Sequence, residues 1–471
     1  MRTSTLSALA LGLLVSLSAC LSACGSEEAK GQSPGTEGDG TEPTATTLSE
    51  AVAVDHIAIY QGVKVTLVED RDRVKKVNAP VIPDRPALIR VHAKPLQYRS
   101  QVRVTAELRI HSTNGSDYVA TQPAMTLVAF DDLELKTTFN FDVPGSAITP
   151  GATVSVVLRD EKSADSTVRF PEDGTDPLGM NVGALAPTLR VKFVPVKYEA
   201  DGSGRTPDMS AAAVENYKNT LYKWYPASKV EVTVRDQLRW PLQVAADGDG
   251  WDQLLDALIE TRSDDAAADD VYYIAVFDPA ATAHEWCTSG EGYGCVLGIA
   301  PQANLRDIYL RVAMITGYSG NEGTLAQELG HAMGRAHAPC GGPQAVDPDY
   351  PYGRASIGVF GWDILDHELI DPDGRVFDFM SYCQPNWVSD YTFAGLYERM
   401  TKVAQTKRPE GPITSGGAGG SKGGFVQISH VLPDGSTRLG PKVRANDVDA
   451  SSFGDRTIAG LRSGLRIAPV R

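Results

Sequence analysis

The residues best suited to chemistry lie in one short stretch, from Gln327 to His337. Gln327 and His331 stand four positions apart, so in a helix both point to the same side and can reach one ion. Glu328 follows Gln327 directly, where its carboxylate could take a proton from water held at that ion. Gly334 permits a sharp turn that would return His337 to the ion as a third ligand. This spacing predicts a metal centre with a general base beside it.

The elements that position this stretch are predicted from apolar spacing in the surrounding chain. Helical spacing occurs at 214–224 and 251–259, and strand-like apolar runs occur at 189–193, 230–234, 271–277 and 308–312. A helix that begins near Glu322 would carry the stretch. Strands that alternate with helices predict an α/β sheet, with this helix packed on its face.

The preceding segment, 52–187, alternates apolar and polar residues and contains turn sequences such as Asn114-Gly115. This pattern is typical of an immunoglobulin-like β-sandwich. Its histidines, His56, His92 and His111, stand in strand-like runs, and we expect them to be packing or surface residues. Residues 411–424 are rich in glycine and predict a linker, whereas 425–471 predicts a small β module.

The N-terminus has the features of a secretory signal. Arg2 precedes an apolar stretch that is too short for an ordinary membrane-spanning helix. Small residues then precede Cys20 and again Cys24, and each site resembles a bacterial lipobox. Lipidation there, with acyl chains such as palmitate, would anchor the protein without spanning the membrane. Neither following residue is the aspartate associated with inner-membrane retention, so we expect the outer membrane or cell surface.

Cysteine parity favours Cys24 as the lipidated residue, although Cys20 remains an alternative. Cleavage before Cys24 leaves an even set of four cysteines, as expected in an oxidising compartment. We predict that these pair as Cys287–Cys295 and Cys340–Cys383. Residues 24–51 are mostly Gly, Ser, Thr, Pro and acidic, which predicts a flexible tether.

The charge balance excludes one class of partner. The 471 residues carry a formal net charge of −15, and no basic stripe stands out. A nucleic-acid partner is therefore not expected, because such binding relies on clustered Lys and Arg.

The stretch from Gln327 to His337, together with Asp378-Phe379-Met380-Ser381-Tyr382-Cys383, resembles the metzincin metallopeptidases over roughly 188–405. Their extended zinc motif is followed by a tight turn with a methionine beneath the metal, which would be Met380. The resemblance implies a zinc-dependent endopeptidase in which His331, His337 and possibly Gln327 hold the ion and Glu328 is the base. It also implies that Tyr382 stabilises the oxyanion.

The predicted chain is multidomain: an immunoglobulin-like β-sandwich, a central α/β metzincin-like zincin domain and a small C-terminal β module. The predicted segments are a signal peptide 1–23, a tether 24–51, a β-sandwich 52–187, a metallopeptidase domain 188–410, a linker 411–424 and a β module 425–471. The expected partners are a protein or glycoprotein substrate and, through the N-terminal lipid, a membrane.

One residue departs from the metzincin pattern, because Gln327 stands where these enzymes have a histidine. An amide oxygen is a weak neutral ligand that suits hard cations better than zinc. Three interpretations stay open: a zinc enzyme with a weakened site, an inactive relative that binds proteins or glycans, or a different metal or damaged gene copy. Calcium is a further possible cofactor, with loop carboxylates as its ligands: Asp347, Asp349, Asp371 and Asp373.

Overall fold

The computed structural model describes residues 47–96, 102–113, 115–163, 165–172, 176–289, 295–406, 424–432, 436–448, 458–459 and 466–469. The chain divides into two compact units, Met1–Thr46 and Thr47–Arg471. The first unit lies outside the described residues, and so do the predicted signal peptide, Cys20 and Cys24. Most of the predicted linker lies outside them as well. The domain boundaries stay predictions.

The predicted fold class, with its α/β metzincin-like zincin domain, is wrong. Strands account for 36% of the structure and helices for 22%, and several of the sheets are small and antiparallel. The sequence reading missed many of these strands because they are only two or three residues long. Such short strands form between loops, where too few residues follow one another to show a period of two.

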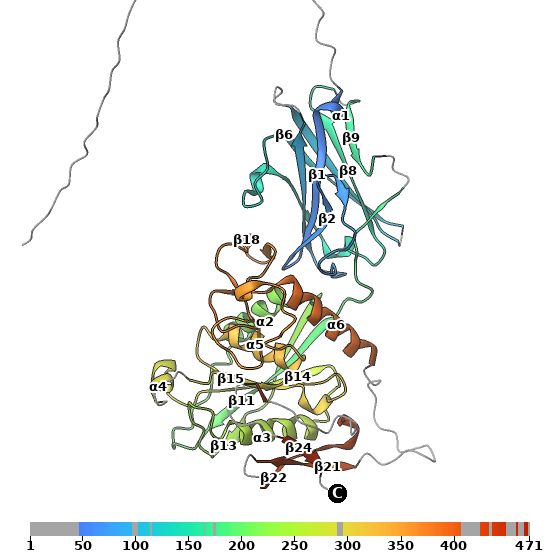
Figure 1. Ribbon diagram of the computed structural model, residues 1–471. Coiled ribbons are helices and arrows are strands. Elements are labelled where there is room, and N and C mark those ends of the chain that lie inside the picture. The colour runs from blue at the N-terminus through green and yellow to red at the C-terminus, as the bar shows by residue number, and fades with distance from the viewer. Residues whose placement is uncertain are drawn as a thin grey trace, which may run out of the picture. The chain divides into compact units, whose positions relative to one another are not determined.

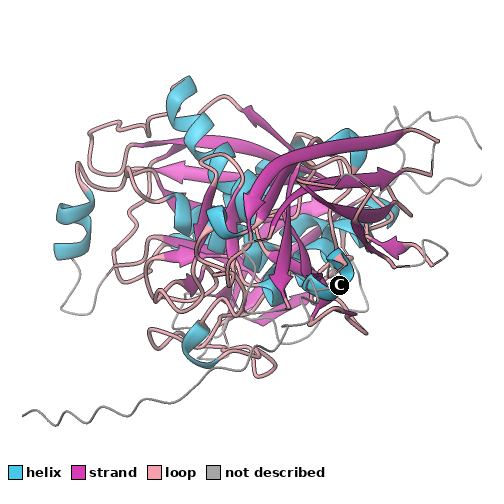
Figure 2. Ribbon diagram, turned by 90° about the horizontal axis from the view of Figure 1, so that it is seen from above, coloured by secondary structure: helices cyan, strands magenta, loops and turns pink. Residues whose placement is uncertain are grey.

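Two antiparallel five-stranded sheets are built from residues 52–179 (Figures 1 and 2). The first has the order β3 (Asp72–Arg73), β2 (Lys64–Glu69), β1 (Val52–Tyr60), β4 (Ala87–Pro95) and β7 (Phe139–Val143). The second has the order β10 (Leu178–Gly179), β8 (Thr153–Asp160), β5 (Arg103–His111) and β6 (Asp117–Thr126), with β9 (Thr167–Phe170) paired to β8. Alternate residues of both sheets, such as Ile57 and Leu108, enter one core. Helix α1 (Leu48–Ala51) precedes β1 and begins inside the range predicted as a tether.

The following part of the chain forms a mixed sheet. Its order is β12 (Lys229–Val234), β11 (Thr188–Tyr198), β14 (Val271–Phe277), β16 (Val312–Thr316), β15 (Gly298–Pro301) and β23 (Ile458–Ala459), with β13 (Leu238–Trp240) also beside β11. β11, β14 and β16 are parallel neighbours, whereas β15 runs antiparallel to β16. Both faces of β14 are buried: Ile274 enters one core and Tyr273 another. This explains its continuous apolar sequence.

Helices cover both faces of the mixed sheet (Figure 1). α2 (Ala211–Trp224), α5 (Glu322–Ala332) and α6 (Asp390–Thr406) share the core on one face, and α3 (Trp251–Asp264) lies on the other. Below α3 lies a sheet of β22 (Thr437–Arg444), β21 (Phe425–Val431) and β24 (Arg466–Pro469). The remaining elements are α4 (Ala283–Thr288), the pair β17 (Gly361–Asp363) and β18 (Glu368–Ile370), and the pair β19 (Phe377–Asp378) and β20 (Asn386–Trp387). Within the described ranges, no helix has the length and apolar character to cross a bilayer.

Arg85 connects the loop after β3 to the end of α2. Its buried guanidinium donates to the carbonyls of Tyr222, Tyr225 and Ala227 at 2.6–2.8 Å. Tyr222 belongs to the last turn of α2, Tyr225 is its C-cap and Ala227 follows the helix, and the negative end of the helix dipole favours a cation there. Burial lowers the pKa of Arg85 to about 10, so the side chain stays charged at neutral pH.

We expect Arg85→Met to lower the free energy of unfolding by about 3 kcal/mol, because it removes a charged donor that three carbonyls share. Urea denaturation measures this change. Arg239→Met is the matched control, since Arg239 is largely exposed and pairs with Glu199 at the surface; its effect should stay below about 1 kcal/mol. Equal losses in the two variants would contradict the role given to Arg85.

Candidate metal centre

Helix α5 carries Gln327, Glu328 and His331 and packs against β15 and β16. The helix ends at Ala332, and Gly334 follows with a φ of 88°, in the left-handed region that favours glycine. The turn is closed by hydrogen bonds from the Gly334 amide to His331 O (2.7 Å) and from the Arg335 amide to Gly330 O (2.9 Å). This turn sends the chain back along α5.

The turn brings His337 against His331. Their Nε2 atoms lie 3.0 Å apart and both residues are buried. His331 Nδ1 lies 2.8 Å from the carbonyl of Arg335, and His337 Nδ1 lies 2.6 Å from the carbonyl of Gln344. A carbonyl only accepts, so each Nδ1 must carry the proton.

Both Nε2 atoms of the neutral rings therefore present lone pairs, and two lone pairs at this distance form no hydrogen bond. Burial, with a smaller contribution from His337, lowers the pKa of His331 to about 3, and burial also lowers the pKa of His337. Neither ring is thus ready to carry a second proton. Two tetrahedral zinc ligands would lie roughly 3.3 Å apart, so a shared cation suits this pair.

Two further polar groups on α5 have unsatisfied atoms. Among the described residues, neither Glu328 Oε2 nor Gln327 Nε2 has a hydrogen-bond partner, although both atoms are buried. Burial raises the pKa of Glu328 well above its ordinary value. A half-turn of the Gln327 amide would exchange its nitrogen for its oxygen, which is the end that can ligate a cation. The two imidazoles and the amide oxygen offer donors that would fit a divalent transition cation, whereas the Glu328 carboxylate does not form one ligand cluster with both imidazoles in the described chain.

Met380 lies directly under α5. A Cβ added to Gly330 would collide with Met380 Sδ, so the buried Met380 side chain would have to move to accommodate it. The segment after His337 is tied to the same turn: the Ala338 amide donates to Met380 O and the Tyr382 amide to Cys340 O, both at 3.0 Å.

Residues 378–383 form a turn around Met380, called the methionine turn below. It is held by Asp378, which is fully buried. Its carboxylate accepts from the Met380 amide at 2.8 Å, the Ser389 amide at 3.0 Å and the Ser389 hydroxyl at 2.5 Å. The sequence reading included Asp378 in the turn but assigned it no role, because a single aspartate gives no sign of which amides it will meet.

Tyr382 stands at the rim of this site. Its side chain is 49% exposed, and its ring lies 5.0 Å from that of His337. Burial of part of the ring and the nearby Glu328 charge raise the pKa of Tyr382. The structure thus brings Gln327, Glu328, His331, His337, Met380 and Tyr382 into one region.

Two of the four carboxylates considered for calcium, those of Asp347 and Asp371, accept hydrogen bonds within the chain. Asp347 accepts from Arg335 and from the Tyr391 hydroxyl (3.0 Å) through one oxygen and from the Asp349 amide through the other. Asp371 accepts from the Asp373 amide at 2.9 Å. These bonds organise the two loops.

The predicted disulfides are confirmed. Cys287 pairs with Cys295, and Cys340 pairs with Cys383 across a Cα–Cα distance of 5.6 Å. The second bond joins the segment after His337 to the methionine turn. Two disulfides are consistent with an extracytoplasmic protein, since such bonds persist in oxidising compartments.

Comparison with known proteins assigns no family. No family model and no curated protein matches the chain. A solved chain described as "Structure of a chaperone-substrate complex" is 13% identical with a TM-score of 0.27, covering 57% of this chain and 39% of that one. The "putative beta-galactosidase from bacteroides fragilis" is 12% identical with a TM-score of 0.15, covering 46% of this chain and 39% of that one. The chain thus spans well under half of either structure.

We expect Gly330→Ala to destabilise the protein by about 1–3 kcal/mol, because the new methyl group collides with Met380. A Gly→Ala change inside a helix usually raises stability, so a loss of stability here would indicate the collision with Met380. Gly323→Ala is the matched control on α5, where a Cβ meets its nearest atom at 3.5 Å; this variant should be neutral or slightly stabilised. Thermal denaturation followed by circular dichroism compares them, and stabilisation by Gly330→Ala would contradict the close approach.

Proposed function

We propose that this chain is a zinc-dependent metalloendopeptidase with a weakened metal site. The observation that carries the proposal is the pair of buried Nε2 lone pairs of His331 and His337, facing each other at 3.0 Å. The resemblance of residues 327–337 and 378–383 to metzincin motifs belongs to the same proposal. That resemblance concerns the residues of the site and not the fold class.

In this proposal His331 and His337 hold the ion, with Gln327 as a weak third ligand. A bound zinc ion would favour the ionised form of Glu328, acidify water and polarise a peptide carbonyl. No described residue donates a hydrogen bond to Glu328 Oε2. This oxygen would accept the proton of the attacking water and pass it to the leaving amine. The half-exposed Tyr382 could donate a hydrogen bond to the developing oxyanion.

The two carbonyls behind the imidazoles have a positioning role. Arg335 O and Gln344 O fix each ring with its Nε2 directed at the other. A ligand held this way loses little rotational freedom when it binds, which favours the metal-bound state. The Cys340–Cys383 disulfide and the methionine turn keep the His337 segment in place.

The cellular location in this proposal is extracytoplasmic, with Cys24 or Cys20 carrying lipid ahead of the predicted tether. Attachment to the outer membrane or cell surface would place the site among extracellular proteins and glycoproteins.

A binding protein without turnover is the second candidate, and Gln327 is the observation that favours it. With an amide in place of an imidazole, zinc affinity falls, and the remaining groups could serve recognition of a protein or glycan. The two candidates differ in whether the site hydrolyses a peptide bond when zinc is supplied.

We expect Glu328→Gln to reduce casein hydrolysis by about 10²–10⁴-fold while leaving zinc content unchanged, because it removes the base and keeps the shape. Zinc is measured by elemental analysis and hydrolysis with and without a chelator. Glu322→Gln, at the start of the same helix, is the control and should retain activity. Chelator-resistant hydrolysis, or equal activity in both variants, would count against the enzyme.

We expect Gln327→His to raise zinc affinity by at least about tenfold and to increase hydrolysis. Changes to groups that only contact metal ligands already shift affinity by about 10–100-fold, so a direct ligand should matter at least as much. Competition with a chromophoric chelator measures the affinity. A Gln327→His protein that binds zinc tightly yet cleaves nothing would favour the binding protein.

A further inference from the structure

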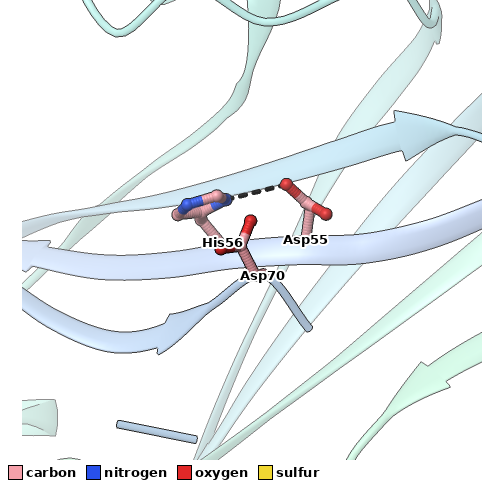
Figure 3. A group of neighbouring side chains, drawn as sticks. All are labelled: Asp55, His56 and Asp70. Carbon is pink, nitrogen blue, oxygen red and sulfur yellow. Dashed lines mark ion pairs between the residues drawn. The ribbon is translucent and has the colours of Figure 1, made fainter. Parts of the chain in front are cut away.

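A second group of metal-binding side chains lies far from α5 in sequence, in the first antiparallel sheet. Asp55 and His56 come from β1, and Asp70 comes from the turn after β2 (Figure 3). One ligand atom from each residue lies within 4.8 Å of the other two. Sequence analysis treated His56 as a packing or surface residue, because nothing in the sequence joins it to Asp70.

A β-bulge explains how two neighbouring residues of β1 face one ligand position. Val54 pairs with Ala93 and His56 pairs with His92, so Asp55 is an extra residue without a partner on β4. Neighbours in a regular strand point to opposite faces. The extra residue breaks this alternation and lets Asp55 and His56 converge, as bulges often do beside functional sites.

The turn that supplies Asp70 is held against this bulge. Asp70 and Arg71 have φ values of 49° and 73°, and Glu69 pairs with Asp72 across the turn. Positive φ at two successive residues other than glycine is strained and persists only where neighbours stabilise it. Here the Arg71 amide donates to the carbonyl of Asp55 at 2.9 Å. The bond connects the turn to the bulge and brings the Asp70 carboxylate over it.

Two atoms at this position lack hydrogen bonds. Asp55 is 1% exposed, and in the described part of the chain neither its Oδ2 nor His56 Nδ1 has a hydrogen-bond partner. The two atoms form an ion-pair contact at 2.9 Å (Figure 3) but are not aligned for a hydrogen bond. The Lys94 ammonium lies 3.6 Å from the other Asp55 oxygen, Oδ1, and its side chain is half exposed. A buried carboxylate oxygen without a donor is unfavourable unless a cation satisfies it.

We propose that Asp55, His56 and Asp70 form a second site for a divalent cation. The donors would be Asp55 Oδ2, His56 Nδ1 and a carboxylate oxygen of Asp70. An imidazole nitrogen favours Zn²⁺ over Ca²⁺ or Mg²⁺, and three protein ligands leave room for water or an outside group. The ion would clamp the strained turn to the bulge. This inference is independent of the proposed peptidase function.

The test measures how many Co²⁺ ions each protein molecule binds. Co²⁺ substitutes for Zn²⁺, and its visible absorption spectrum depends on its ligands. The full chain with His331→Ala and His337→Ala, which lacks the α5 ligands, is titrated with Co²⁺ under equilibrium dialysis. We expect one bound equivalent. Adding Asp70→Asn, which alters an exposed side chain, should weaken Co²⁺ binding at least about tenfold. Asp72→Asn is the control, since it removes the same charge two residues further on.

Two more readouts complete the test. His56→Gln should change the cobalt spectrum because a nitrogen donor is lost, and Zn²⁺ should raise the thermal midpoint of the Asp72→Asn protein more than that of Asp70→Asn. If the His331→Ala and His337→Ala substitutions impair folding, Asp70→Asn and Asp72→Asn are compared as single variants. The Asp70→Asn protein should then bind one equivalent of Co²⁺ fewer than the Asp72→Asn protein. Equal cobalt binding by these two variants, or no bound cobalt in either background, would overturn the proposal.

Discussion

The arrangement around α5 depends on one constraint: two neutral imidazoles present lone pairs to each other inside the protein. The constraint arises because each neutral ring carries one N–H group, at Nδ1, and donates it to Arg335 O or Gln344 O. Both carbonyls belong to the chain that follows the Gly334 turn, so the ring orientations depend on where that segment lies. The disulfide, the hydrogen bonds to the methionine turn and the close approach at Gly330 all fix the same segment.

Two buried carboxylates near this segment show the difference between a structural and an unsatisfied acid. Asp378 accepts three hydrogen bonds that hold the methionine turn, which offsets its desolvation. Glu328 is equally removed from solvent, but its Oε2 has no donor in the described chain. An unsatisfied buried oxygen costs roughly 1–3 kcal/mol or more when charged. The cation proposed at His331 and His337 would reduce this penalty if it lies close to Glu328.

The sequence predicted the parts of the site that depend on local spacing. The four-residue interval between Gln327 and His331 places both on one face of α5, and the predicted pairing of each cysteine with its next neighbour in sequence was correct for both disulfides. It failed where structure depends on which segments pair, a property that local spacing does not record. The short strands β17–β20 carry no readable period, and the fold class was wrong because such strands were overlooked. Asp55, His56 and Asp70 were missed for the same reason, since a bulge is defined by its partner strand.

The two groups of unsatisfied atoms share a physical logic despite their different elements. Each lies beside a turn whose backbone has positive φ angles: the Gly334 turn in one case and the Asp70–Arg71 turn in the other. A fold that keeps buried donors and acceptors unpaired loses stability that its packing must offset. A cation that binds only the folded chain would return part of that stability. Cation binding and folding should therefore be coupled at both positions, and the coupling should be stronger at α5, where more of the ligand atoms are removed from water.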